Sequence, residues 1–292
     1  MPIVNGETTT PSRRTGGSPR ALVLTGYGLN CDWETAYALQ LAGAEAHRVH
    51  INSLILGDQI GEKASLQDYH ILAFTGGFSW GDDHGAGVIL ATRLLYNMGQ
   101  EILQFIEAGK LIIGICNGFQ ALVNLGLLPG FAGDYRTRRV ALIGNDCGNF
   151  RDQWVNLAVN KESPCVFTRG LDRLELPVRH GEGKFFAAEQ VIQKLIDHNQ
   201  VVLRYAQADG SPAAGRYPAN PNGSLEDIAG ICDPTGRVFG LMPHPEAFNN
   251  WTNHPDWSRQ KEHYRRRRLP YPEVGLGVEI FRNAVAYFTE AA

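Results

Sequence analysis

The sequence predicts an α/β protein with a mostly parallel sheet flanked by helices and with added β-hairpins. Short, continuously apolar runs alternate with segments of helical periodicity, which is the pattern of parallel strands buried on both faces. From about residue 131 to 186 the pattern changes to alternating strands and turn residues, as in hairpins. The first 20 residues are polar and interrupted by Pro and Gly, so we expect a mobile tail at 1–20 and one domain at 21–292.

The domain begins with strands and a helix in alternation. A strand is predicted at 21–25, where ALVLT is continuously apolar. A helix is predicted at 32–42, which is rich in helix formers and repeats its apolar residues at helical spacing. AHRVHIN and YHILAFTGG then repeat the strand signal at 46–52 and 69–77. These alternating elements are typical of βαβ units.

The middle and the end of the domain continue this pattern. Helical spacing at 87–108 leads into KLIIGI at 110–115, which reads as a strand buried on both faces. The hairpin region includes the predicted strand RLELPVRH at 173–180. The remaining predicted elements are the strands 201–206, 228–233 and 237–242, of which the last two are joined by the turn PTG, and an amphipathic helix at 277–288.

Composition limits the possible functions. The chain has 292 residues and a formal net charge of -3, which provides no general attraction to nucleic acid or to an anionic membrane. No apolar run approaches the roughly 20 residues of a membrane span. The five cysteines form no CxxC pair and their number is odd, which favours free thiols in a reducing, cytoplasmic compartment over disulfides or a zinc site. We therefore expect a small-molecule substrate or a protein partner.

One cysteine occupies a position suited to catalysis. GICNG places Cys116 at the end of the predicted strand 110–115, between two glycines and before a helical segment, as in a nucleophile elbow. The positive end of the following helix favours the thiolate form, and the Asn117 N–H is a candidate for half of an oxyanion hole. A buried structural cysteine is the alternative, because free cysteine is among the most buried residue types.

A base and a second oxyanion donor are found elsewhere in the chain. MPHPE places His244 just past the predicted strand 237–242, and Glu246 lies two residues later, on the same side of an extended segment. A carboxylate there can orient the imidazole toward a thiol, as a Cys-His-acid triad requires. FTGGFSWGDD begins at the end of another strand, and its two glycines allow a backbone N–H to point at a substrate carbonyl.

Five motifs carry a family resemblance. In chain order they are LNCDWETAYALQLAGAEAHRVHIN, GGFSWGD, GICNGFQALVNLGLLPG, LPVRHGEGKF and MPHPE. Together they resemble the glutaminase subunits of phosphoribosylformylglycinamidine synthase, which are class I, triad-type glutamine amidotransferases of purine biosynthesis with a flavodoxin-like fold. The resemblance covers nearly the whole chain after the tail.

The resemblance implies a role for each of seven residues. Cys116 would be the nucleophile that forms a γ-glutamyl thioester, His244 the general base and acid, and Glu246 its orienting carboxylate. The other implied site residues are Gly77 and Asn117 for the oxyanion hole, and Gln120 and His180 for binding L-glutamine. The implied partner is an ATP-dependent synthetase subunit that receives the ammonia, and a small accessory subunit could join the complex. We expect no cofactor or metal on this chain, with ATP and Mg²⁺ on the synthetase subunit.

Several alternatives remain at the level of the sequence. The chain could be a catalytically silent sensor or regulatory module on the same fold, or an amidotransferase subunit that serves another acceptor. Cys31 also follows a strand and opens a helix, so it competes with Cys116 as the nucleophile. The insert at 249–275, with its arginine run Arg265 to Arg268, is predicted as a solvated loop, with docking of the synthetase subunit as the alternative.

Overall fold

The computed structural model describes residues 17–60 and 64–290. Most of the predicted tail at 1–20 lies outside the described residues. The described chain is built on a nine-stranded sheet with the order β2-β1-β3-β4-β11-β10-β9-β6-β7, and on a separate two-stranded sheet of β5 and β8. The fold is therefore α/β with antiparallel additions, as predicted.

The main sheet has a parallel half and an antiparallel half. The first five strands in its order pair in parallel, whereas β10, β9, β6 and β7 each pair antiparallel with their neighbours. The hairpin residues thus extend the main sheet at one side. The strands are β1 (Arg20–Thr25), β2 (Glu45–His50), β3 (Ile71–Phe74), β4 (Leu111–Ile115), β5 (Val140–Gly144), β6 (Arg151–Val159), β7 (Arg173–His180), β8 (Glu182–Ala187), β9 (Val201–Ala206), β10 (Ile228–Cys232) and β11 (Val238–Leu241).

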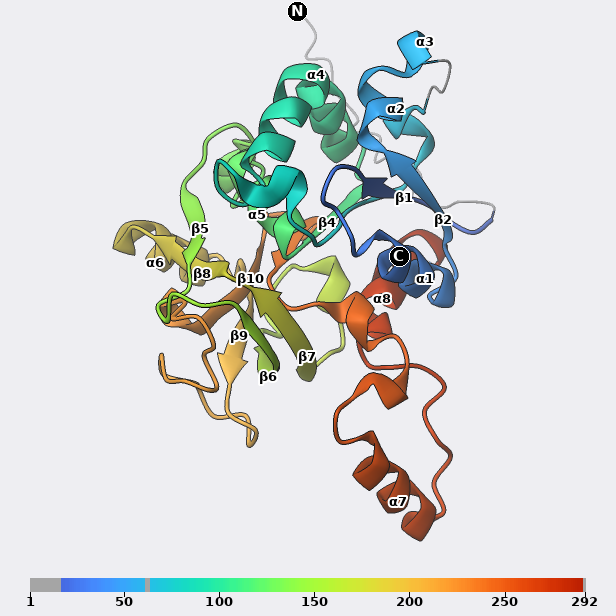
Figure 1. Cartoon of the computed structure of the whole chain (residues 1–292), viewed down its shortest axis with the longest axis vertical. Coiled ribbons are helices and arrows are strands. Elements are labelled where there is room, and N and C mark those ends of the chain that lie inside the picture. The colour runs from blue at the N-terminus through green and yellow to red at the C-terminus, as the bar shows by residue number, and fades with distance from the viewer. Residues whose placement is uncertain (1–16, 61–63, 291–292) are drawn as a thin grey trace, which may run out of the picture.

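Helices cover the parallel half. In Figure 1, α4 and α5 lie above these strands, and α1 and α8 lie below them and pack against each other. The α-helices are α1 (Asp32–Leu41), α2 (Ile51–Ile55), α3 (Gly57–Ile60), α4 (Val88–Glu107), α5 (Asn117–Asn124), α6 (Glu189–Asp197), α7 (Trp257–Arg267) and α8 (Val278–Thr289). None of the helices in the described ranges is long and apolar enough to cross a membrane.

The core lies between these layers and explains why β4 is central. All five residues of β4 are buried, since β3 and β11 flank it and helices cover both its faces. Burying one large aliphatic side chain contributes about 1.5–3 kcal/mol, so the continuous apolar run LIIGI both forms this strand and holds it at the centre. Residues at its carboxyl end are therefore held in a rigid frame.

Three predicted elements differ from the structure. The strand predicted at 46–52 ends at His50, where α2 begins with Ile51. The strand predicted at 69–77 is shorter, because β3 ends at Phe74 and Gly77 turns the chain with a φ of 143°. The insert at 249–275 was predicted as a solvated loop, and that prediction is wrong for its middle, which forms α7. This helix has no buried residue, so it lacks the apolar stripe by which a sequence reveals a helix.

Candidate active site

Three adjacent parallel strands bring the predicted site residues to one edge of the sheet. β4 lies between β3 and β11, and all three run in the same direction. Gly77 follows β3, Cys116 follows β4 and His244 follows β11. The carboxyl ends of parallel strands meet at one edge, where open α/β sheets commonly bind their ligands.

Cys116 sits in a strained turn. Its backbone has φ 51° and ψ -106°, a conformation that residues other than glycine rarely adopt. Its N–H donates to the carbonyl of Leu241 at 2.8 Å, and its thiol lies 3.5 Å from the carbonyl oxygen of Arg179. Strain of this kind is typical of functional positions. The conformation is that of a nucleophile elbow between β4 and α5.

The small residues around Cys116 allow this elbow to form. A Cβ on Gly118 would lie 2.6 Å from the carbonyl carbon of Phe74, so α5 packs against β3 only because residue 118 has no side chain. A Cβ on Gly114 would come 2.8 Å from the carbonyl carbon of Gly118. The glycines on both sides of Cys116 are thus required by close backbone approach.

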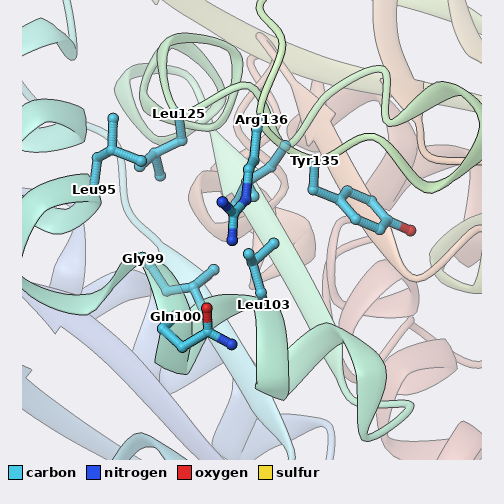
Figure 2. Close-up of a pocket in the computed structure, with 9 residues that line it drawn as sticks. Leu95, Gly99, Gln100, Leu103, Leu125, Tyr135 and Arg136 are labelled. Atoms are coloured by element: carbon cyan, nitrogen blue, oxygen red, sulfur yellow. The ribbon is translucent and has the colours of Figure 1, made fainter.

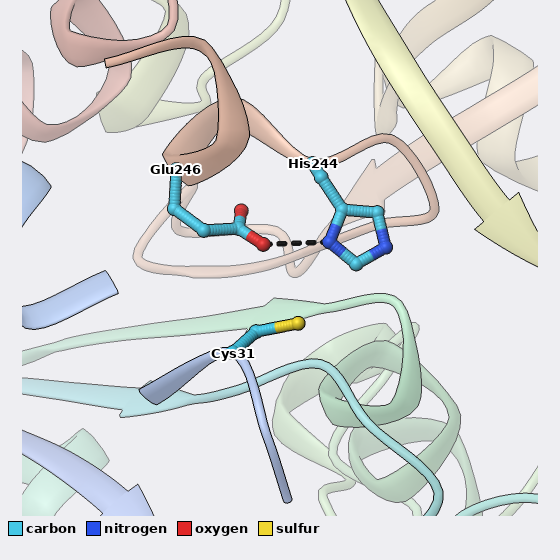
Figure 3. Close-up of side chains that lie close together, drawn as sticks. All are labelled: Cys31, His244 and Glu246. Carbon is cyan, nitrogen blue, oxygen red and sulfur yellow. Dashed lines mark hydrogen bonds and ion pairs between the residues drawn. The ribbon is translucent and has the colours of Figure 1, made fainter. Parts of the chain in front are cut away.

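His244 and Glu246 form a buried pair, drawn in Figure 3. Nδ1 of His244 lies 2.6 Å from Oε1 of Glu246, and the two side chains are 2% and 1% exposed. Burial disfavours the charged imidazole, but the Glu246 carboxylate and the Cys116 thiol outweigh it, so the pKa of His244 lies well above its ordinary value. Nε2 of His244 has no hydrogen-bond partner in the described chain and is free for proton transfer.

Two backbone amides beside Cys116 are available for an oxyanion. Asn117 is the first residue of α5, where the helix offers its amide no internal acceptor. Neither the Gly77 amide nor the Asn117 amide donates a hydrogen bond to any residue in the described ranges. A Cβ on Gly77 would lie 2.8 Å from Cα of Leu29, so this position also requires glycine. The two amides can stabilise developing negative charge.

The side chain of Gln120 is engaged within the protein. Its Nε2 donates to the carbonyl of Glu182, and its Oε1 accepts from Nδ2 of Asn117 at 3.0 Å. Nδ2 of Asn117 also lies 3.1 Å from Oδ1 of Asp82, and burial raises the pKa of Asp82. This network ties the elbow to the loops at 76–84 and 180–183. The side-chain amide of Gln120 therefore positions the elbow. A direct contact between Gln120 and glutamine stays a prediction.

His180 is held as a neutral ring. It is 2% exposed, its Nδ1 lies 3.1 Å from Oδ1 of Asn145, and its Nε2 lies 3.5 Å from Nδ2 of Asn222. Burial, and then the neighbouring His244, lower the pKa of His180 to about 3. The sequence analysis did not single out Asn145 and Asn222, because each lies in a separate loop with no local motif. A contact between His180 and glutamine stays a prediction.

Cys31 lies beside the His244–Glu246 pair, as Figure 3 shows. A ligand atom of each of these three residues lies within 4.8 Å of those of the other two. Burial raises the pKa of the Cys31 thiol above its ordinary value, although the neighbouring His244 opposes this. Cys31 is therefore a protonated thiol at neutral pH, and a thiol is a poorer nucleophile than a thiolate.

The same three residues could in principle hold a metal ion. Cys, His and Glu are all zinc ligands. However, Nδ1 of His244 is already bonded to Glu246, and a metal at that nitrogen would replace the hydrogen bond that orients the imidazole. The arrangement therefore fits acid–base chemistry better than metal binding.

A separate pocket lies against α4, away from these residues. Figure 2 shows its lining, which comes from α4 and from the segment that follows α5. It has a volume of about 320 Å³, and Leu95, Leu103 and Leu125 make it largely apolar. None of the predicted site residues lines it.

Comparisons with known proteins agree with this geometry. A family model described as a CobB/CobQ-like glutamine amidotransferase domain matches residues 18–288. A Methanococcus maripaludis protein named phosphoribosylformylglycinamidine synthase subunit PurQ is 45% identical over 273 residues, which cover 93% of this chain and 98% of that protein. A Dehalococcoides mccartyi protein of the same name is 47% identical over 268 residues, covering 92% and 97%.

A solved structure is similar over the same extent. A chain in the structure of PurLQS from Thermotoga maritima is 30% identical, with a TM-score of 0.65. The match covers 92% of this chain and 99% of that chain. The likeness therefore extends over the parallel half of the sheet and the antiparallel half alike.

Proposed function

Because the chain belongs to the CobB/CobQ-like glutamine amidotransferase family, we propose that Cys116, His244 and Glu246 hydrolyse glutamine and release ammonia for transfer. The chain is a glutaminase subunit of phosphoribosylformylglycinamidine synthase and acts in purine biosynthesis, like its relatives named as PurQ subunits. The observation that carries the catalytic assignment is the strained Cys116 elbow, one strand away from the buried His244–Glu246 pair.

The first half of the reaction forms a thioester. The Cys116 thiolate attacks the side-chain amide carbon of glutamine, and the carbonyl oxygen takes up negative charge that the Gly77 and Asn117 amides stabilise. The imidazolium of His244 then gives its Nε2 proton to the leaving nitrogen. Ammonia departs, and a γ-glutamyl thioester remains on Cys116. The raised pKa of His244 supports this step, because it keeps the proton donor charged at neutral pH.

The second half of the reaction regenerates the thiolate of Cys116. Neutral His244 takes a proton from water, the hydroxide oxygen attacks the thioester carbon, and the sulfur leaves as a thiolate. Glutamate is released with the new oxygen. Glu246 stays ionised and holds Nδ1–H of His244, so the imidazole keeps Nε2 toward the reacting atoms in both halves.

The ammonia has an acceptor on another subunit. The PurLQS structure is named for an assembly of subunits, and the chain associates with a synthetase subunit of that kind. In this proposal ATP and Mg²⁺ bind to the synthetase subunit, since the steps on Cys116 and His244 need only protons and water. The proposal places the protein in the cytoplasm, where the thiol of Cys116 stays reduced.

Labelling with a diazo-ketone analogue of glutamine tests the site. The full chain is treated with the analogue, with and without glutamine and with and without the synthetase subunit and its ligands. Peptide mass mapping then locates the adduct. We expect an adduct on Cys116 that glutamine prevents, and Cys116→Ala should not be labelled. An adduct on Cys31, or none even in the complex, would refute the assignment.

A further inference from the structure

An arm leaves the body of the protein directly after the triad. The arm comprises residues 249–275, and its two ends meet, since the Gly275 N–H donates to the carbonyl of Asn249 at 2.9 Å. The side-chain amide of Asn249 also donates to the carbonyl of Glu246 at 2.9 Å. A Cβ on Gly275 would lie 2.7 Å from the carbonyl carbon of Phe248. The base of the arm is thus bonded to the turn that holds the catalytic carboxylate.

A second anchor holds the arm to the sheet, and beyond it the arm stands free. Nε2 of His254 lies 3.1 Å from Oε2 of Glu175 on β7, and its ring packs 4.8 Å from Trp154 on β6. A hollow of about 510 Å³ separates the farther part of the arm from β7 and α8. In Figure 1, α7 projects away from the rest of the molecule.

The projecting part has its own small aromatic core. Trp251 stacks on Tyr271 with ring centroids 5.4 Å apart, and Trp257 lies 6.1 Å from Trp251. Tyr264 lies 6.2 Å from Tyr271. These contacts give the arm a defined shape without help from the body. A shaped projection loses less conformational entropy on binding than a flexible loop does.

The end of the arm, residues 257–271, carries strong positive charge. From 257 to 268 it has six Lys or Arg residues and one acid, Glu262. Glu262 pairs with two of the arginines, at 2.7 Å each. Arg267 and Arg268 are exposed and make no ion pair with any residue in the described ranges. Basic residues in a last helical turn interact well with the helix dipole, but Arg268 lies past the helix, so the dipole does not explain the full run.

Apolar side chains lie next to these arginines. Leu269 is 46% exposed and Tyr271 is 44% exposed. Arginine and exposed aromatic residues are enriched at protein–protein contact sites. The net charge of the whole chain is -3, so the arm is much more basic than the chain as a whole.

We infer that residues 257–271 dock on an acidic surface of the synthetase subunit, next to the edge of the sheet where Cys116 lies. This inference rests on the proposed function. Ammonia becomes unreactive ammonium once it is protonated in water, so the subunit that accepts it must cover this edge. The arm follows the turn after β11 that carries His244 and Glu246, and its base is bonded to Glu246. Docking of the arm therefore also restrains the turn that carries the triad.

Charge reversal tests the inference. Arg267→Glu combined with Arg268→Glu is compared with the wild-type chain for binding to the synthetase subunit of the same organism, by titration calorimetry with glutamine present. We expect about a 10-fold or greater loss of affinity and a weaker dependence on salt. Arg138→Glu with Arg139→Glu is the matched control, because it makes the same charge change on an exposed loop before β5, and it should bind like the wild type.

The binding measurements can overturn either the docking of the arm or the proposed function. If both double variants lose affinity equally, or if the arm variant binds like the wild type, the inference is wrong. If the wild-type chain does not bind the synthetase subunit at all, the proposed function fails instead. Binding of a single-stranded RNA to the wild type but not to the arm variant, with synthetase binding unchanged, would assign the arm to nucleic acid.

A second variant guards against misfolding. Residues 250–274 are replaced by two glycines, since Asn249 and Gly275 are already in hydrogen-bond contact. Labelling of Cys116 by the diazo-ketone reports whether this variant has kept its site. A variant that is labelled normally and binds the synthetase subunit as tightly as the wild type would also overturn the inference.

Discussion

Glu246→Gln removes a buried charge next to the catalytic imidazole and keeps the shape of the side chain. Oε1 of Glu246 lies 2.6 Å from Nδ1 of His244, and both side chains are almost fully buried. A hydrogen bond to a charged group contributes about 1.5–3 kcal/mol. Without the carboxylate that favours the imidazolium, the pKa of His244 should fall. A loss of about 1.5–3 kcal/mol of transition-state stabilisation corresponds to about a 10- to 100-fold loss of rate, at about 1.4 kcal/mol for each tenfold step.

The sign of the pH effect follows from the direction of the shift. The pKa of His244 is raised in the folded chain, so its imidazolium persists to higher pH than that of an ordinary histidine. Any stability that this raised pKa contributes is present at low pH and is lost as pH rises through the folded pKa. In Glu246→Gln the imidazolium is lost earlier, and the alkaline limb of the activity profile should move to lower pH.

Glutamate release by the complex with the synthetase subunit, followed across neutral and alkaline pH, measures this limb. Glu279→Gln on α8 is a suitable control, because within the described residues Glu279 pairs only with the exposed Arg282, at 2.6 Å. The control should keep the profile of the wild type. An unchanged alkaline limb in Glu246→Gln would refute the role given to the carboxylate.

Three further predictions concern the elbow and its neighbours. Gly118→Ala should lower the free energy of unfolding by about 3 kcal/mol or more in urea denaturation, because the new Cβ would overlap β3. The control is Gly144→Ala, whose Cβ would meet open space. It should change the free energy of unfolding by less than about 0.5 kcal/mol. His180 stays neutral down to about pH 3, so the unfolded chain alone takes up its proton as pH falls below about 6.5. His180→Gln should therefore weaken the acid-side loss of stability by up to about 1.4 kcal/mol per pH unit, measured by denaturation at several pH values. Cys31→Ala should keep labelling of Cys116 by the diazo-ketone, whereas an adduct on Cys31 in Cys116→Ala would make Cys31 the nucleophile.

Much of the fold could be predicted from local pattern. The strands at 21–25 and 110–115 and the helix at 87–108 are recovered within one residue at each end, because apolar runs and helical spacing report burial directly. The helix α7 was not predicted, because its own residues show no apolar period. Its stability comes from rings such as Trp251 and Tyr271, which lie outside the helix, so no period within it shows an apolar face.

Part of the candidate site could also be predicted from the sequence. Residue type and spacing singled out Cys116, His244 and Glu246, since a thiol, an imidazole and a carboxylate at strand ends have few common structural roles. The hydrogen bond from Gln120 to the carbonyl of Glu182 and the asparagines around His180 were not foreseen. Those contacts join segments far apart in the chain and leave no periodic trace.

The sequence by itself determined which chemical groups are present, which of them end a strand, and which backbone positions need glycine. Tertiary structure alone decided which strand ends are neighbours. The order β3-β4-β11 brings Gly77, Cys116 and His244 to one edge, although more than 160 residues separate the first from the last. It also brought Cys31 to the triad and bonded the arm to Glu246. The physical reason is that local periodicity reports burial, whereas strand order results from long-range packing that no single segment encodes.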